Sequence, residues 1–259
     1  MGNSYSIYIS EYVYDPFEYN KSYQIDNIKN ISYKSILLDY SYLYNKEDRI
    51  IYNINNKGFS VVCAIATSLN YYSNNKYYSP GFIQYCVQLE LQSDNIYRGV
   101  SVIDALNIIQ KYGVCLESDY SFTNILNNES PSTNNFKLAK NNNINYYSIK
   151  QINTQMIHVL SSKNIFIIGI TLYNNFDYDT YNKDYNVDKN IINYQQIIQI
   201  PSEDDIIIGT KCFLVIGHND IEEYFIILDC SLNIEYKISY DYLEDTKFSN
   251  DLFVIKPMD

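Results

Sequence analysis

The sequence predicts an α+β protein of two lobes, with helices in the first half of the chain and an antiparallel sheet in the second. Between residues 61 and 112 apolar side chains recur at helical spacing, whereas after residue 165 they gather in short runs rich in Ile, Val and Phe. A polar stretch of Asn and Ser separates the two halves. A chain of 259 residues is long enough to bury the core that such a fold requires.

This change of pattern divides the chain into three segments. Residues 1–35 are rich in Tyr and Asn without a regular period, and we expect them to form an N-terminal arm. Residues 36–145 are predicted to form a helical lobe and residues 146–259 a β-rich lobe. The boundary falls at the end of the polar stretch, residues 121–146, which is typical of a surface connection.

The helical lobe is expected to contain three helices. The first begins near Val62 or Cys63, after the loop residues Gly58 and Ser60, and places small apolar residues such as Ala64 on a buried face. A Ser-Pro pair opens the second helix, and a glycine after the last apolar residue ends the third. The predicted helices cover residues 62–72, 79–91 and 102–112.

The β-rich lobe is expected to contain a short helix and buried strands. The helix covers residues 154–161, and the strands cover residues 165–172, 212–217, 224–229 and 252–256. Between the first two strands lies a polar stretch rich in Tyr and Asp, from Asn174 to Asp205. Its length is compatible with either a functional lid or a passive insertion.

Charge and hydropathy limit the partners and the compartment. Thirty acidic residues against nineteen basic ones give a net charge of −11, which disfavours nucleic acid and anionic membranes as partners. The sequence shows neither a signal-peptide core nor a transmembrane segment, so we expect a cytoplasmic protein, or one packaged in a virion, rather than a secreted one. The start of the chain, with Gly2 after Met1 and Ser6 four residues later, fits the loose N-myristoylation pattern.

The cysteine and histidine content argues against disulfides and metals. The five cysteines are odd in number and lack CxxC spacing, so neither a disulfide framework nor a zinc site is expected. We expect no other metal and no cofactor. The cysteines are Cys63, Cys86, Cys115, Cys212 and Cys230.

Cys63 stands out because it is predicted at the first turn of a buried helix, where free N–H groups and the helix dipole favour a thiolate. A buried cysteine is by itself more often a small apolar residue than a nucleophile. The surrounding sequence, however, resembles the nucleophile segment of papain-like cysteine peptidases, Gln-Gly-x-x-Gly-Ser-Cys-x-Ala. Gly58, Cys63 and Ala64 occupy matching positions.

Further segments resemble the same family in the same order along the chain. They are Ser79-Pro80-Gly81-Phe82, the run from Gly99 to Glu117, the strand Ile165 to Ile170 followed by Phe176, the run Gly209 to His218, and the run Phe225 to Ser231. The resemblance covers residues 36–256 and is greatest to the branch without a long inhibitory prosegment. It implies a papain-like fold in which a cleft between the helical and β lobes would hold a thiol peptidase site.

The resemblance also assigns four functional positions, of which only one keeps the family residue. Cys63 stands at the nucleophile position, but Lys211 replaces the catalytic His, Asp229 replaces the Asn, and Lys57 replaces the oxyanion-hole Gln. His218 lies too close to Asp229 along the chain to take the catalytic His place, since the family needs a longer hairpin. We expect the other histidine, His158, to be structural.

These replacements change the expected chemistry. A lysine base would need its pKa, ordinarily about 10.4, lowered toward the operating pH, whereas a neighbouring aspartate favours the charged ammonium. Lys211 and Asp229 therefore look like an ion pair in place of a proton relay. Val61 and Val62, which precede the cysteine, are stiff and would narrow the place for a substrate carbonyl, although Lys57 could still donate to an oxyanion.

We predict a papain-fold pseudoenzyme that has lost peptidase activity and binds a protein or peptide in the cleft between the lobes. One alternative is an active cysteine peptidase or transferase with an unusual Cys63–Lys211 pair. Another is a structural or virion-packaged protein whose thirty tyrosines cluster at an interface. If the tyrosines are scattered instead, the codon bias of an AT-rich genome explains them.

Overall fold

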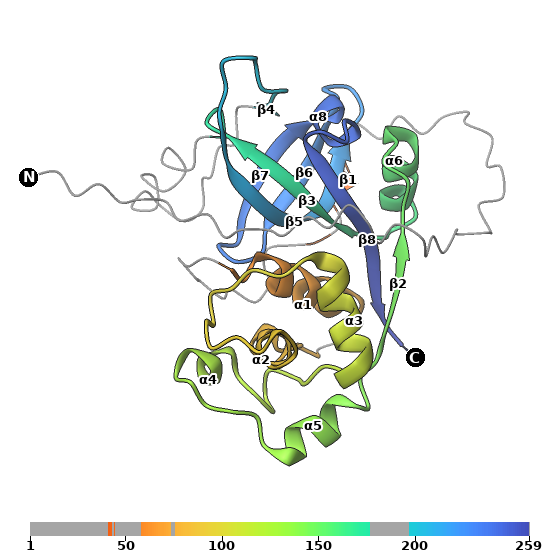
Figure 1. Ribbon diagram of the computed structural model, residues 1–259. Coiled ribbons are helices and arrows are strands. Elements are labelled where there is room, and N and C mark those ends of the chain that lie inside the picture. The colour runs from red at the N-terminus through yellow and green to blue at the C-terminus, as the bar shows by residue number, and fades with distance from the viewer. Residues whose placement is uncertain (1–40, 43, 45–57, 74–75, 177–196, 259) are drawn as a thin grey trace, which may run out of the picture.

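A computed structural model describes residues 41, 42, 44, 58–73, 76–176 and 197–258 of the chain. It confirms the predicted α+β class, with helices gathered at one end and a large sheet at the other (Figure 1). The N-terminal arm, residue Lys57 and most of the stretch from Asn174 to Asp205 lie outside the described residues, so the arm and the lid stay predictions.

The helical half begins with the three helices that the sequence predicts, within two residues of the expected ends. Their N-terminal serines explain two of the starts, since Ser79 and Ser101 each accept a hydrogen bond from a backbone N–H in the first turn of the helix that follows. The helices are α1 (Ser60–Tyr72), α2 (Pro80–Leu91) and α3 (Val102–Tyr112).

The polar stretch predicted as a surface connection instead contains two further helices, α4 (Phe122–Leu126) and α5 (Thr133–Ala139). Ser121 and Ser132 cap them, and Phe122, Ile125 and Ala139 of the two helices are buried against the rest of the helical half. Most residues of this stretch are exposed or half-buried, and serine caps with a few buried apolar residues suffice to form its short helices.

The second half of the chain forms most of one large sheet. The four predicted strands correspond to β3 (Phe166–Tyr173), β5 (Ile207–Asn219), β6 (Tyr224–Asp229) and β8 (Ser249–Pro257), and the predicted short helix is α6 (Asn153–Ser161). The elements not predicted are β1 (Ser41–Tyr42), β2 (Ile144–Ser148), β4 (Ile197–Ile198), β7 (Ile234–Ser239) and α8 (Tyr240–Glu244).

The sheet is almost entirely antiparallel. Its strands follow the order β2-β8-β3-β5-β6-β7-β4, β1 adds to β5 beside this path, and β4 and β7 form the parallel pair. β2 spans the position at which the boundary between the two lobes was placed, so this strand connects the helical half directly to the sheet.

Each face of the sheet packs against different helices. On β5, Cys212 and Leu214 belong to a buried cluster with α1 and the other helices of the first half, whereas Phe213 and Val215 belong to a second cluster with α6 and α8. This alternation is the expected consequence of side chains pointing to opposite faces of a strand. The sheet therefore lies between two apolar layers.

Polar contacts attach α1 to the sheet along its length. The Ser68 hydroxyl donates to the carbonyl of Ile255 on β8 at 3.1 Å. At the end of the helix, the Tyr72 hydroxyl accepts from the backbone N–H of Ile165 at 3.0 Å. Because these bonds join residues far apart in the sequence, they fix the direction of α1 across the strands.

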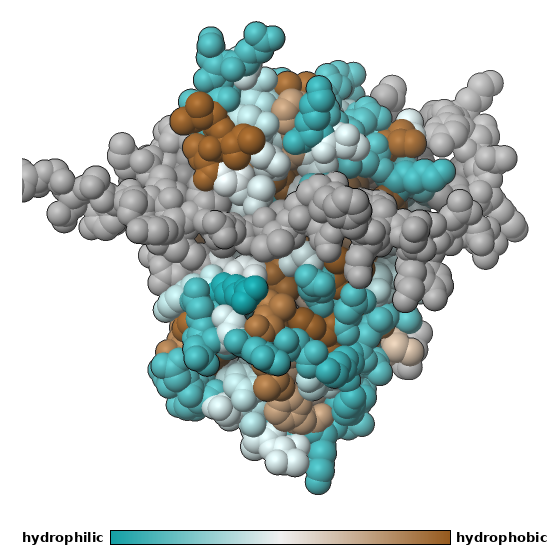
Figure 2. All heavy atoms as spheres, in the orientation of Figure 1, coloured by the Kyte–Doolittle hydropathy of each residue, from teal (hydrophilic) through white to brown (hydrophobic). Residues whose placement is uncertain are grey.

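The surface on the face shown in Figure 2 has an apolar patch at the upper left, over the segment between β4 and β5. Exposed isoleucines of this segment are Ile200, Ile206 and Ile207. Among the tyrosines that the structure describes, Tyr77 and Tyr97 are the most exposed, and they lie in different loops of the helical half. None of the described helices is long and apolar enough to cross a membrane.

Candidate functional site

Cys63 is the fourth residue of α1, because the helix begins two to three residues before the predicted start near Val62 or Cys63. The helix begins at Ser60, and the N–H of Cys63 already donates to the carbonyl of Phe59 at 2.9 Å. Gly58 makes the early start possible, since its φ of 93° lies in the left-handed region and a Cβ there would collide with the carbonyl oxygen of Tyr97. The N–H of Cys63 is therefore not one of the free donors at the helix end.

The environment of Cys63 disfavours its thiolate. The residue is fully buried, with an exposed fraction of 0%. Burial raises the pKa of the Cys63 thiol well above its ordinary value, and the neighbouring Cys230 and Asp229 raise it further. Lys211 lowers the pKa of this thiol through its positive charge, but this effect is smaller than those of burial, Cys230 and Asp229.

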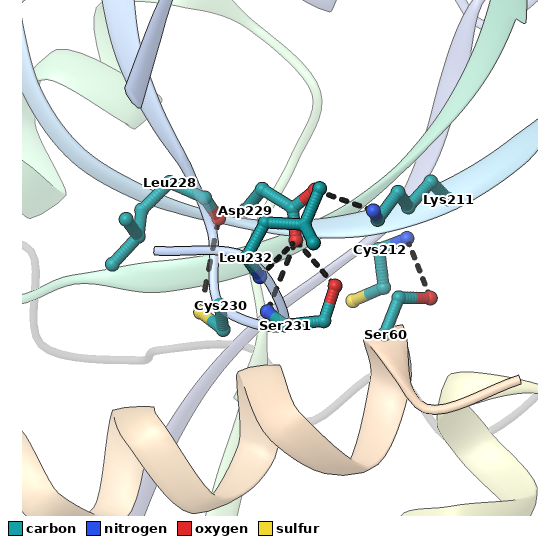
Figure 3. Close-up of polar contacts among 8 residues, drawn as sticks. All are labelled: Ser60, Lys211, Cys212, Leu228, Asp229, Cys230, Ser231 and Leu232. Carbon is teal, nitrogen blue, oxygen red and sulfur yellow. Dashed lines mark hydrogen bonds and ion pairs between the residues drawn. The ribbon is translucent and has the colours of Figure 1, made fainter. Parts of the chain in front are cut away.

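Lys211 and Asp229 form an ion pair across two neighbouring strands. Leu214 of β5 pairs with Leu228 of β6, so Lys211 and Asp229 are diagonal neighbours on the same face, within reach of a long side chain. The side chain of Asp229 is fully buried, and the side chain of Lys211 is 15% exposed. Figure 3 shows the pair on the side of the strands away from α1.

The carboxylate of Asp229 also organises the turn after β6. Its Oδ1 atom accepts from the Ser231 hydroxyl at 2.6 Å, from the Ser231 N–H at 3.0 Å and from the Leu232 N–H at 3.2 Å. Its Oδ2 atom bonds to Lys211. Both oxygens therefore have hydrogen-bond donors, as a buried carboxylate requires.

Two residues that sequence reasoning missed lie on the α1 side of these strands (Figure 3). The N–H of Cys212 donates to the Ser60 hydroxyl at 3.3 Å, which attaches the first residue of α1 to β5. Cys230 is the neighbour that most raises the pKa of the Cys63 thiol after burial itself. Strand alternation could have found both, since they flank the predicted pair by one residue each.

The two histidines lie elsewhere. His218 is fully buried near the other end of β5, where its Nδ1 atom lies 2.8 Å from Asp220. The Tyr240 hydroxyl donates to the same carboxylate at 2.6 Å. His158 lies on α6. Neither histidine is among the groups that influence the pKa of the Cys63 thiol.

Solved structures of cysteine proteases resemble this arrangement of helices and sheet. Xylellain, a cysteine protease from Xylella fastidiosa, superposes with a TM-score of 0.69 at 20% identity, over 86% of this chain and 88% of that one. Digestive procathepsin L 3 of Tenebrio molitor superposes with a TM-score of 0.55 at 12% identity, over 88% of this chain and 72% of that one. Procathepsin B from Trypanosoma congolense superposes with a TM-score of 0.54 at 10% identity, over 87% of this chain and 79% of that one.

The chain has a papain-like fold. Neither a protein-family model nor a curated protein sequence matches it. At these levels of identity the likeness concerns the fold, so the roles of individual residues in this papain-like chain rest on their own geometry.

Within this papain-like fold, three of the four expected site positions are described. Lys211 and Asp229 form an ion pair on β5 and β6, and both influence the pKa of the Cys63 thiol on α1. The fourth residue, Lys57, lies outside the described residues. Val61 and Val62, just before the cysteine, are both buried in the core. All five cysteines are buried, and no group of metal-ligating side chains is present among the described residues.

Proposed function

We propose that this chain is a papain-fold protein that does not hydrolyse peptides and acts by binding a protein or peptide between its two lobes. The observation that carries the proposal is the complete burial of the Cys63 thiol, with a pKa raised well above its ordinary value. Acyl transfer needs a thiolate that a substrate carbonyl can reach, and a buried neutral thiol meets neither requirement.

The residues at the general-base position support the same proposal. A catalytic base must accept a proton from the nucleophile and later donate it to the leaving amine. Lys211 is held as the ammonium partner of a buried carboxylate, and Asp229 in turn is engaged by the turn at Ser231. This arrangement suits a fixed ion pair rather than a group that exchanges protons in each catalytic cycle.

The runner-up is an active cysteine hydrolase or transferase that uses Cys63 and Lys211. It is favoured by one observation, the positive charge of Lys211, which lowers the pKa of the Cys63 thiol. Such an enzyme would need an opening motion to expose the sulfur. Its activity would be lost in Lys211→Ala as well as in Cys63→Ala.

The deciding experiment combines turnover with thiol labelling. Purified full-length protein and its Cys63→Ala variant are incubated with a fluorogenic peptide library, with an active cysteine protease as positive control. In parallel, native protein is treated with iodoacetamide, and each cysteine is quantified by peptide mapping. We expect no hydrolysis that depends on Cys63 and labelling of Cys63 as slow as that of Cys212, which is also fully buried.

The controls make either outcome informative. Denatured protein should label at all five cysteines, which shows that slow labelling reflects burial. Peptide turnover that disappears in Cys63→Ala, or labelling of Cys63 well ahead of Cys212, would contradict the pseudoenzyme. Failure of the full chain to retain any member of an immobilised peptide and protein panel would contradict the binding half of the proposal.

A further inference from the structure

The segment between β4 and β5 carries a surface feature that the candidate site leaves unexplained. It exposes three isoleucines, of which Ile206 is 64% exposed, Ile207 62% and Ile200 43%. Figure 2 shows that apolar atoms gather over this segment, at the upper left of the face drawn. Single exposed apolar residues need no explanation, but a cluster of them is typical of a binding surface. We call these three residues the isoleucine patch.

Hydrogen bonds fix the backbone that carries the patch. The carboxylate of Asp205 accepts from the Ser202 N–H at 2.7 Å and from the Ser202 hydroxyl at 2.9 Å. Asn174, just after β3, donates its N–H to the carbonyl of Ile206 at 3.0 Å, and its side-chain oxygen accepts from the N–H of Ile206 at 3.1 Å. The isoleucines are therefore presented on an ordered support, which lowers the entropy cost of binding a partner.

A bulge at the start of β5 separates the exposed isoleucines from the core. Gly209 pairs with Leu172 and Ile207 pairs with Tyr173, so Ile208 is an extra residue on β5. Ile208 packs against the cluster with α6 and α8, whereas the isoleucine just before it stays exposed. The exposure of the patch is thus built into the register of the strand.

Acidic side chains border the patch. Glu203 and Asp204 lie in the turn between Ile200 and Ile206, and both are exposed. Among the residues that the structure describes, no hydrogen bond or ion pair engages either of these two carboxylates. The turn therefore combines exposed apolar surface with two negative charges that are available to a partner.

The cations on neighbouring strands have other partners. Lys211, further along β5, bonds to Asp229. Lys237 of β7, which is paired with β4, lies 4.0 Å from Glu222 and over the ring of Tyr224. Neither lysine neutralises the two carboxylates of the turn, so a partner would have to supply the positive charge.

We propose that the isoleucine patch binds a basic, apolar segment of another protein. Apolar side chains of that segment cover the isoleucines, and its lysines or arginines pair with Glu203 and Asp204. The net charge of −11 adds attraction at longer range. A second copy of the chain is disfavoured, because a symmetric contact would bring the same carboxylates together. The patch shares no residue with the group of Cys63, Lys211 and Asp229, so the proposal does not depend on what that group does.

Three labelled heptapeptides test the chemistry of the partner. The first alternates Leu and Lys, the second has Glu in place of Lys, and the third has Ser in place of Leu. Fluorescence anisotropy of each peptide with the full chain gives the dissociation constants. We expect the Leu-Lys peptide to bind at least about tenfold more tightly than the other two. Its binding should weaken as salt is added, because exposed charges are screened.

Substitutions in the turn locate the binding. Ile206→Ser/Ile207→Ser should raise the dissociation constant of the Leu-Lys peptide at least about tenfold, because the apolar contact is lost. Glu203→Gln/Asp204→Asn should raise it at least about threefold and reduce its dependence on salt.

Matched controls make the same changes elsewhere on the surface. Leu89→Ser/Leu126→Ser removes exposed leucines of α2 and α4, and Asp94→Asn/Asp119→Asn removes two exposed charges of the helical half. Both controls should bind the Leu-Lys peptide as the original chain does. The second control lowers the net charge by as much as the acidic variant of the turn, so it separates local contacts from general attraction.

The remaining outcomes would overturn the proposal. If the folded isoleucine variant, checked by circular dichroism, binds the Leu-Lys peptide as the original chain does, the peptide binds elsewhere, for example between the lobes. Equal binding of all three peptides, or none up to millimolar concentration, would exclude a basic, apolar partner. Sedimentation with phosphatidylcholine vesicles that requires Ile206 and Ile207, without peptide binding, would show that the patch contacts lipid instead.

Discussion

At the scale of single residues, Asp229 holds the candidate site together. Its carboxylate is fully buried, bonds to Lys211 through one oxygen and holds the Ser231 turn through the other. A buried carboxylate is costly unless such partners surround it. Removing either partner therefore leaves a charge without its counter-charge, which would not happen in a pair of neutral His and Asn side chains.

Substitutions at this pair should reveal the coupling. We expect Lys211→Met to lower the free energy of unfolding by about 3 kcal/mol, because it leaves the Asp229 carboxylate buried without its cation. Asp229→Asn should also destabilise, since its amide would face the Lys211 ammonium. Chemical denaturation of both single variants and of the double variant measures the interaction energy.

The double variant separates an ion pair from two independent residues. It should lose less stability than the sum of the single losses, by about 1–3 kcal/mol. Ser231→Ala serves as a comparison that removes one donor to Asp229 but leaves the ion pair in place. Strictly additive losses for Lys211 and Asp229 would mean that the pair contributes no coupling.

At the scale of elements, α1 determines the environment of the cysteine. Its start at Ser60 places Cys63 one turn into the helix, and the Ser60 hydroxyl accepts a hydrogen bond from β5. Val61 and Val62, which follow Ser60, are both buried in the core. The cysteine therefore faces the sheet core, because the whole first turn of the helix is packed against it.

The buried hydrogen bond of Ser68 should contribute to this packing. Its hydroxyl donates to the backbone carbonyl of Ile255 on β8. Ile255 lies opposite Tyr146 at a position where the main chain makes no hydrogen bond to β2. Ser68→Ala should therefore lower the free energy of unfolding by about 1–2 kcal/mol, because a buried carbonyl loses its donor. Ser162→Ala, on the exposed end of α6, should change it by less than about 0.5 kcal/mol. Equal effects of the two substitutions in thermal or urea unfolding would contradict this role of Ser68.

At the scale of the whole molecule, the sheet connects the two halves of the chain. Its strands contribute alternate side chains to the cluster with α1 and to the cluster with α6 and α8. Neither cluster can lose its strands without disrupting the other. The lobes expected from the sequence thus share β-strand residues, and β2 links them covalently.

This sharing predicts that the two halves unfold together. In hydrogen exchange under rising urea, amides of α3 and of β6 should lose protection at the same denaturant concentration, and calorimetry should show one transition. The comparison of α3 with β6 is informative because the two elements lie in different predicted lobes. Two separated transitions, with the helices melting first, would show that the lobes are independent.

Particular residues show how much of this could be predicted from the sequence. The apolar runs of β3, β5, β6 and β8 and the serine and glycine signals around α2 and α3 were sufficient to predict the fold class. The short helices α4 and α5 were missed because they lie in a stretch rich in Asn and Ser and are too short to show a helical spacing of apolar residues. β2 was missed because its sequence, Ile-Asn-Tyr-Tyr-Ser, lacks the run of Ile, Val and Phe by which the other strands were predicted.

The sequence by itself predicted the class of the fold and the pairing of Lys211 with Asp229 on two successive strands. These depend on local periodicity and on residue identity. Only the tertiary structure decided that Cys63 is buried one turn into α1, beside Cys230 and close to the Lys211–Asp229 pair. Burial depends on how a helix packs against strands more than a hundred residues away, and no local pattern contains that information.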